Sequence, residues 1–403
     1  MTATELVQQI RNAMALAQNR VRNLVETYPG LYPLFTLSGR WKHNRPHWTN
    51  WCDGFLPGMM WLFLESGLAD DPAYWRAKAE EYSRGVESRK NDRDVHTLGF
   101  IFYHGSHKRW YEATLMEGKP DTALREVALH AARVLSQRFS EEGKYLRGFL
   151  GNDSLLIDSA MNVPLLLYAA AETGDEKLRR IGIESALTTR KFLVRGDGSV
   201  AQQALFDTRT GECLRHTTEQ GFRADSTWSR GLAWSMYGFV DCYEWSKEPR
   251  FLETAEASAR FFIERTPPNG IPPWDYDAPP TGLVARTYTD SSAAAIAACA
   301  FFLLARVLGD APRAVGYRNA ALSIVNTLTR PPFLVEDPEW QGILRGGIYH
   351  IHKDLGVNES VMWGEFYFVE ALNMALSALA RITVPAPAAP ATQQSMEKSA
   401  ASV

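Results

Sequence analysis

Met161-Asn162-Val163-Pro164-Leu165-Leu166-Leu167-Tyr168 and Ala293-Ala294-Ala295-Ile296-Ala297-Ala298 carry apolar residues around nearly the whole circumference of a helix. A helix that is apolar on all sides has no face for water and must be buried. Five predicted helices share this character, over 54–67, 158–172, 226–246, 290–308 and 359–381. We therefore expect these five helices to line the inside of the fold.

A second set of predicted helices carries many Arg, Lys and Glu residues, so each has one face suited to water. These helices lie over 71–88, 122–138, 175–193, 250–265 and 312–331, and two more are expected over 3–26 and 98–105. Inner and outer helices that alternate six times describe an all-α fold, a single (α/α)6 barrel. Its cleft is expected where the inner helices and their leading loops converge.

Two segments depart from the helical pattern. The stretch 196–222 has short extended pieces around Asp207-Thr208-Arg209-Thr210-Gly211, which predicts a short hairpin over the mouth of the barrel. Residues 384–403 are rich in Pro and Ala and are expected to be disordered. The folded part is then one domain over residues 1–383.

Composition excludes several classes of protein. The chain has 403 residues, of which 45% are hydrophobic and 22% are charged, as in ordinary globular proteins. The net charge is −3 and no basic block occurs, so nucleic acid is not an expected partner. No apolar run reaches the roughly 20 residues of a membrane span, so no membrane partner is expected either.

The N-terminus and the cysteines indicate the compartment. Residues 1–6 lack the basic and apolar segments of a secretion signal. The four cysteines are scattered, without the spacing of metal ligands. Free thiols in a reducing cytoplasm are the simplest interpretation, and we expect no metal.

Asp158 stands directly before a wholly apolar helix. One interpretation is an N-cap, because Asp is a favoured capping residue and suits the helix dipole. The other is a carboxyl in a dry pocket, whose raised pKa lets it donate a proton near neutral pH.

Arg230 and Trp234 are four residues apart and therefore share one face of a helix. A guanidinium forks onto a carboxylate, and an indole stacks on the C–H face of a sugar ring. The pair suits a carboxylated sugar. Trp51, before an apolar helix, is either a sugar-stacking wall or packing, and His96 is either a core histidine or a donor in the site.

Taken together, six segments resemble the unsaturated glucuronyl hydrolases, glycoside hydrolase family 88, which are related to family 105. The segments are WCDGFLPGMMWL (51–62), HTLGFIFY (96–103), LLIDSAMNVPLL (155–166), STWSRGLAW (226–234), PPWDYDAP (272–279) with TDSSAAAIAA (289–298), and ESVMWGEFYFVEAL (359–372). They span residues 51 to 372 in the order of the family. The family fold is the (α/α)6 barrel, in agreement with the helix pattern.

The resemblance implies a glycoside hydrolase that acts on acidic oligosaccharides left by polysaccharide lyases. These carry a 4,5-unsaturated uronic acid at the non-reducing end. The implied reaction hydrates a vinyl ether: an acid protonates C4, water adds at C5, and the resulting hemiketal opens and releases the aglycone. No metal or organic cofactor is implied.

Position by position, Asp158 matches the family acid that donates the proton and activates water. Arg230, Trp234, Gln220 and Trp51 match residues of the sugar site.

Three positions depart from the family pattern. Thr97 stands where the family usually has a second aspartate, Gln202 where we align a histidine, and Leu232 where RGQAW has glutamine. A hydroxyl at Thr97 is no anion at neutral pH. Loss of a neighbouring carboxylate is expected to lower the pKa of Asp158, because a like charge is removed.

Three explanations of Thr97 stay open. The enzyme works with Asp158 alone, or with Asp94 or His96 as a substitute; or it has shifted to another sugar or linkage; or it binds sugar without turnover. The shifted enzyme would be an unsaturated rhamnogalacturonyl hydrolase or a glycosidase on saturated uronides. The polysaccharide of origin and the choice between monomer and homodimer are not determined by the sequence.

Overall fold

The computed structural model describes residues 2–42, 51–285 and 287–383. Its outer helices are α1 (Ala3–Thr27), α3 (Pro72–Val86), α5 (Thr122–Ser136), α7 (Glu176–Leu193), α9 (Pro249–Arg265) and α11 (Pro312–Leu328). Its inner helices are α2 (Phe55–Glu65), α6 (Ser159–Thr173), α8 (Ser229–Ser246), α10 (Ser291–Leu308) and α12 (Met362–Thr383), together with the π-helix η2 (Phe100–Gly105), which leads into α4 (His107–Met116). Short 3-10 helices are η1 (Glu87–Asn91) and η3 (Ile351–Lys353).

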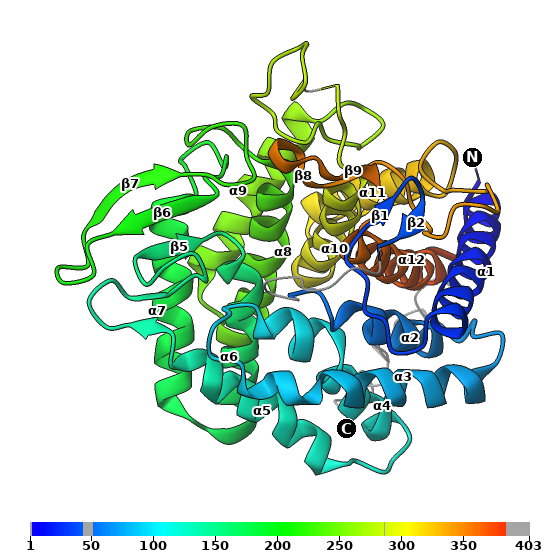
Figure 1. Ribbon diagram of the computed structural model, residues 1–403, viewed down its shortest axis with the longest axis horizontal. Helices are drawn as coiled ribbons and strands as arrows, with labels where there is room; N and C mark the ends of the chain where they lie inside the picture. Colours follow the sequence, from blue (N-terminus) through cyan, green and yellow to red (C-terminus); the bar gives the residue numbers. More distant parts are fainter. Residues whose placement is uncertain (1, 43–50, 286, 384–403) are drawn as a thin grey trace, which may run out of the picture.

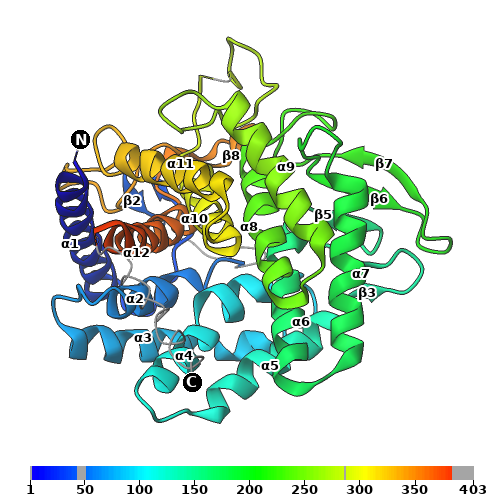
Figure 2. The same ribbon diagram turned by 180° about the vertical axis from the view of Figure 1, so that it is seen from behind.

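The inner segments close into a ring (Figure 1). Contacts run from α2 to η2, then through α6, α8, α10 and α12 back to α2. Each inner segment also packs against an outer helix, and α1 packs against α12, so that an outer layer surrounds the ring (Figure 2). The structure is an (α/α)6 barrel, and the prediction from helical patterning is confirmed.

The boundaries of the predicted helices agree with the structure to within a few residues, with one exception. The sequence prediction placed one helix over 98–105 and none over 107–116, whereas the sixth inner segment consists of η2 and α4. The bend between them forms at Ser106, whose backbone N–H and hydroxyl both donate to the carbonyl oxygen of Ile101, at 2.8 and 2.7 Å. This five-residue spacing widens the helix by a residue and redirects it.

The inner helix α10 is long and apolar enough to cross a membrane by composition. In the protein, 78% of its apolar window is buried, and it lies in the inner ring between α8 and α12. Its composition is therefore that of a core helix.

Close backbone approach between inner segments depends on glycine. A Cβ on Gly238 of α8 would lie 2.4 Å from the carbonyl oxygen of Ala160 in α6, and one on Gly54 would lie 2.5 Å from the Cα of Ile101. Such distances are shorter than any ordinary contact, so a side chain at these positions would force the inner segments apart.

The described residues also form four small antiparallel sheets. Their strands are β1 (Thr36–Leu37), β2 (Arg40–Trp41), β3 (Phe139–Ser140), β4 (Tyr145–Leu146), β5 (Ser154–Leu156), β6 (Gln203–Phe206), β7 (Cys213–Thr217), β8 (Gly347–His350) and β9 (Leu355–Glu359). Strands β6 and β7 form the predicted hairpin and continue the sheet of β5, which leads directly to α6. The turn of the hairpin extends outward in Figure 1, so its root is the part next to the barrel mouth. The expected disordered tail, 384–403, lies outside the described residues.

Gly238→Ala tests the packing of the ring. We expect it to lower the free energy of unfolding by about 1–3 kcal/mol or more, because the new methyl group overlaps the backbone of α6. Urea unfolding measures the change. Gly316→Ala is the matched control, since a Cβ there on the exposed side of α11 meets nothing within 4 Å. It is expected to stabilise the helix by up to about 1 kcal/mol. Equal effects of the two changes would contradict close packing at Gly238.

Candidate functional site

Asp158 occupies the N-cap position of α6, yet its side chain makes no capping hydrogen bond. Its Oδ1 is buried and has no hydrogen-bond partner among the described residues, while the residue as a whole stays partly exposed. The capping interpretation of Asp158 is therefore wrong, and the carboxyl is available to a ligand. Its position is fixed through the backbone, because Asn162 Nδ2 donates to the carbonyl oxygen of Asp158 at 2.8 Å.

The surroundings of Asp158 favour its protonated form. Burial raises the pKa of the carboxyl to about 6, against the opposing influence of the Arg230 charge and of a backbone hydrogen bond. Desolvation is the larger effect because water stabilises a carboxylate more than the protein interior does. The pKa of Asp158 thus stays raised with Thr97 in place of a second acid, since burial alone supplies the shift.

Arg230 lies in the first turn of α8 and is 1% exposed. Its Nη1 pairs with Asp290 Oδ2 at 3.4 Å and donates to the carbonyl oxygen of Ile348, and its Nη2 donates to the carbonyl oxygen of Tyr349 at 3.0 Å. Desolvation lowers the pKa of this guanidinium, while Asp290 and Asp158 raise it. A buried cation requires such partners, and here they come from the N-terminus of α10 and from β8.

The aromatic neighbours of Arg230 differ from the expected one. Its guanidinium carbon lies 4.3 Å from the ring centre of Trp228 and 4.9 Å from that of Trp363. Trp234 is 1% exposed and packs instead on Phe100, with ring centres 5.1 Å apart. The expectation of an Arg230–Trp234 pair is corrected accordingly: acceptors in β8 and α10 draw the guanidinium toward Trp228 and Trp363.

Trp51 lies at the centre of an aromatic cluster. Its ring centre is 4.9 Å from that of Trp363 and 5.3 Å from that of Phe100. Because Trp51 is only partly buried, part of its surface stays accessible. Phe100 in turn donates its backbone N–H to Asn162 Oδ1 at 3.2 Å, which connects the cluster to the first turn of α6.

The two glutamines meet at the root of the hairpin. Gln202 Oε1 accepts hydrogen bonds from the backbone N–H groups of Glu219 at 2.8 Å and Gln220 at 2.9 Å, and from the hydroxyl of Thr218. Gln220 Nε2 donates to the carbonyl oxygen of Tyr349 at 2.9 Å. Gln202 therefore holds the turn that places Gln220, and Tyr349 links both glutamines to Arg230.

His96 and Thr97, in the loop before η2, have buried polar atoms without hydrogen-bond partners. His96 is fully buried and both ring nitrogens lack partners among the described residues, as does Thr97 Oγ1. Burial lowers the pKa of His96 to about 3, so the ring is neutral, and it stacks on Phe149 with ring centres 5.4 Å apart. Buried polar atoms without partners cost about 1–3 kcal/mol each, and such groups collect where a ligand completes them.

Six of the eight predicted site residues thus belong to one network of contacts. Gln202, Gln220, Arg230 and Trp51 are connected through Tyr349 and Trp363, and Trp51, Trp234 and Asp158 are connected through Phe100 and Asn162. His96 and Thr97 stand in the loop that leads into η2.

Residues that the sequence reasoning did not place in the site are Trp228, Asp290, Tyr349 and Trp363. Trp228, Asp290 and Trp363 stand in segments that carry the resemblance, although none of them was assigned to the site. Tyr349 stands in none. Asp94, a suggested substitute acid, is exposed on the surface.

Gln202→Ala tests the anchoring of the turn. We expect the free energy of unfolding to fall by about 1–3 kcal/mol, because the change leaves three donors without their acceptor. Gln203→Ala is the matched control: Gln203 is equally buried, but its Oε1 has no partner among the described residues. A loss below about 1 kcal/mol is expected there. Urea unfolding of both variants decides the question, and equal losses would refute the anchoring role.

Known proteins match the chain along most of its length. The unsaturated glucuronyl hydrolase of Bacillus sp. (strain GL1) is 33% identical over 333 residues, which is 80% of this chain and 85% of that protein. The unsaturated chondroitin disaccharide hydrolase of Streptococcus pyogenes serotype M1 is 31% identical over 80% of this chain and 80% of that protein. The crystal structure of the unsaturated glucuronyl hydrolase from Bacillus sp. GL1, described as responsible for the degradation of glycosaminoglycan, superposes with a TM-score of 0.80 at 30% identity. It covers 92% of this chain and 96% of that one.

The family match covers the site as well as the fold. The sequence pattern described as Glycosyl Hydrolase Family 88 matches residues 35–267. This range includes Trp51, His96, Asp158 and Arg230. The chain belongs to Glycosyl Hydrolase Family 88 and is a glycoside hydrolase.

Proposed function

We propose that this glycoside hydrolase releases a 4,5-unsaturated uronic acid from the non-reducing end of acidic oligosaccharides that a lyase has generated. The names of its relatives support this substrate class, since they act on unsaturated glucuronyl sugars and on unsaturated chondroitin disaccharides. The single observation that carries the proposal is Asp158, a helix-end carboxyl that caps nothing.

The proposed reaction needs one group that both gives and takes a proton. Protonated Asp158 donates its proton to C4 of the double bond, and the positive charge that develops is shared by C5 and the ring oxygen. Water then adds at C5 and returns a proton to the carboxylate. The resulting hemiketal opens, and the bond between C1 and the aglycone oxygen breaks. A pKa of about 6 keeps a useful fraction of Asp158 protonated near neutral pH.

Arg230 contributes mainly through its charge. Three acceptors already bind its Nη atoms. Few of its N–H groups are therefore left for the bidentate hydrogen bonds to a substrate carboxylate that the sequence suggests. The buried cation favours a carboxylated ring in the site and limits the rise of the Asp158 pKa. We assign the stacking surface for the sugar ring to Trp51, whose face is partly accessible. We assign Gln220 and Gln202 to the same sugar site, because Tyr349 connects them to Arg230.

A second candidate function rests on Thr97. Neither the hydroxyl of Thr97 nor the neutral ring of His96 carries a negative charge. Among the described residues, no second carboxylate influences the pKa of Asp158. An enzyme without such a partner is suited to another uronide, such as an unsaturated rhamnogalacturonyl or a saturated uronide. Sugar binding without turnover is the remaining alternative.

The proposal extends to the setting of the enzyme. We place it in the cytoplasm, as a monomer or homodimer that uses no metal or organic cofactor and binds neither nucleic acid nor membrane. The net charge of −3 and the lack of a basic block in the sequence support the part of this proposal that concerns nucleic acid. We take residues 1–383 as the catalytic domain.

Asp158→Asn tests the assignment. On unsaturated disaccharides from glycosaminoglycan, ulvan and gellan-type polymers, the wild-type protein is expected to bleach the ultraviolet absorbance of the double bond. The variant is expected to lose about 10²–10⁴-fold in kcat, because an amide donates no proton to carbon, while it still binds the sugar. Asp153→Asn, five residues earlier in the chain, is the matched control and should keep its activity.

The outcomes separate the candidates. Bleaching that depends on Asp158 supports the proposed reaction, and bleaching by Asp158→Asn at the wild-type rate would refute it. Mass spectrometry of a wider panel that finds product with no loss of a double bond would favour the saturated-uronide alternative. Binding with no turnover on any sugar would favour the non-catalytic one.

A further inference from the structure

A cavity lies at the end of the barrel opposite to Asp158. Its volume is about 980 Å³. It is lined by the C-terminal halves of α2, α8, α10 and α12, together with η2 and α4. The site residues Asp158 and Arg230 lie instead at the N-terminal ends of α6 and α8. The cavity is therefore separate from the proposed catalytic centre.

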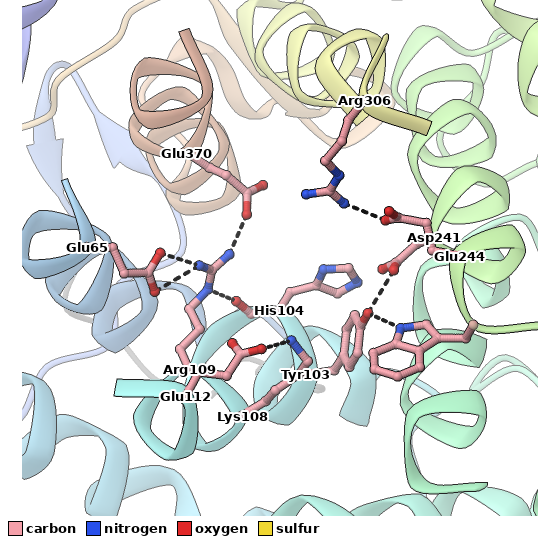
Figure 3. A network of polar contacts seen from close by, with 11 residues as sticks. Glu65, Tyr103, His104, Lys108, Arg109, Glu112, Asp241, Glu244, Arg306 and Glu370 are labelled. Atoms are coloured by element: carbon pink, nitrogen blue, oxygen red, sulfur yellow. Dashed lines mark hydrogen bonds and ion pairs between the residues drawn. The ribbon is translucent and has the colours of Figure 1, made fainter. Parts of the chain in front are cut away.

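The lining of this cavity carries six carboxylates and five cations, and Figure 3 shows the polar network at its centre. Five carboxylates belong to its polar network, and they are Glu65, Glu112, Asp241, Glu244 and Glu370. Three cations face them, and they are Lys108, Arg109 and Arg306. The ends of α2, α8 and α10 add partial negative charge, because the last carbonyl groups of a helix point that way.

Most of these charges are already paired. Lys108 pairs with Glu112 at 2.7 Å and Arg306 with Glu244 at 2.5 Å. Arg109 serves two carboxylates at once, Glu65 at 3.1 Å and Glu370. At the rim, the cations Lys247 and Arg318 and the carboxylate Asp310 also line the opening. Among the described residues, Asp241 is the interior carboxylate that forms no ion pair.

Asp241 is 6% exposed and is held in one orientation. Its Oδ1 accepts a hydrogen bond from the hydroxyl of Tyr103 at 2.7 Å, and that hydroxyl accepts one from Trp245 Nε1 at 2.6 Å. Within the described part of the chain, Oδ2 makes no hydrogen bond. Burial raises the pKa of Asp241 to about 7, although the charges of Lys108 and Arg306 oppose the shift.

His104, which is 2% exposed, supplies a second acceptor at the centre of the network (Figure 3). Its Nε2 lies 2.9 Å from the carbonyl oxygen of Met161, and because a carbonyl only accepts, this nitrogen carries the ring hydrogen. Burial lowers the pKa of His104 to about 3, so the ring is neutral. Its Nδ1 therefore keeps a lone pair, which no described residue uses.

The chemistry of these groups selects the kind of cation. Among the described residues, no group of three or more His, Cys, Asp and Glu side chains could hold a metal ion. The walls are partly aromatic, with Tyr103, Tyr237 and Trp245 lining the cavity. Aromatic faces attract ammonium groups, and Lys108 Nζ already lies 4.8 Å from the ring centre of Tyr103.

We propose that this cavity binds a small aliphatic amine, whose primary ammonium group donates hydrogen bonds to Asp241 Oδ2 and His104 Nδ1. An ammonium group has three donors and no acceptor, which matches a buried carboxylate beside an unprotonated imidazole nitrogen. Its charge neutralises part of the excess negative charge of the network. Tyr237 and Leu303, which both line the cavity, offer apolar surface to the alkyl part.

Calorimetric titration of the full chain with 1,4-diaminobutane tests the proposal, with 1,4-butanediol as the neutral control of equal length. Wild-type protein is expected to bind the diamine and not the diol. Asp241→Asn is expected to weaken the diamine Kd at least about tenfold, because it removes a hydrogen bond to a charged group. The asparagine oxygen still accepts from Tyr103, so the fold is expected to persist, and thermal unfolding checks this.

Asp310→Asn on the exposed rim is the matched control and is expected to leave Kd within about twofold. No binding of the diamine to the wild-type protein would overturn the proposal. Equal binding of diamine and diol, or equal affinity of the wild-type protein and Asp241→Asn, would also overturn it.

Discussion

The inner helices of this barrel have to approach each other almost backbone to backbone, and the positions of the functional groups depend on that approach. Gly238 meets the carbonyl of Ala160, and Gly54 meets the backbone of Ile101. Gly99, in the loop before η2, meets the backbone of Asn162 in the same way. These contacts set how far apart the first turns of α6 and α8 lie, and so where Asp158 and Arg230 stand relative to each other.

The same packing explains the acidity of the site. A ring of apolar helices removes water from one side of Asp158, and this desolvation raises its pKa to about 6 even though a guanidinium opposes the shift. Arg230 remains charged in that setting because Asp290 and two β8 carbonyls compensate it. Burial raises the pKa of Asp158, so that this carboxyl holds a proton closer to neutral pH. Burial lowers the pKa of Arg230, whose charge therefore depends on its fixed partners.

Parallel inner helices also give the two ends of the barrel opposite electrostatic character. The N-terminal ends of α6, α8 and α10 carry partial positive charge and adjoin Asp158 and Arg230, where a carboxylated sugar is proposed to bind. The C-terminal ends of α2, α8 and α10 carry partial negative charge and adjoin Asp241 and His104, where an amine is proposed to bind. The proposed ligands of the two ends differ in the sign of their charge, in accord with the direction of the helices.

Much of this architecture follows from local sequence, and some of it cannot. Helices such as α6 and α10 are predictable because residues apolar on every side leave burial as the only outcome. The sequence pattern did not predict α4, because Gly105 and Ser106 interrupt the helical pattern between η2 and α4. The hydrogen bond from Ser106 back to Ile101, five residues earlier, also leaves no trace in the periodicity of the sequence. The partners of Arg230 were missed for another reason: Ile348 and Tyr349 are more than a hundred positions away in the chain. The prediction that Trp234 lies beside Arg230 rested only on their helical spacing.

The proposed reaction depends most on the protonation state of the Asp158 carboxyl, which can be measured directly. A carbon-13 NMR titration of aspartate carboxyl groups, with the resonance assigned by its absence in Asp158→Asn, reports the pKa of this side chain. We predict a midpoint near pH 6, with the protonated form dominant below it. A midpoint at the ordinary value for aspartate, about 3.9, would contradict the account, because a carboxyl of that strength would hold almost no proton at neutral pH.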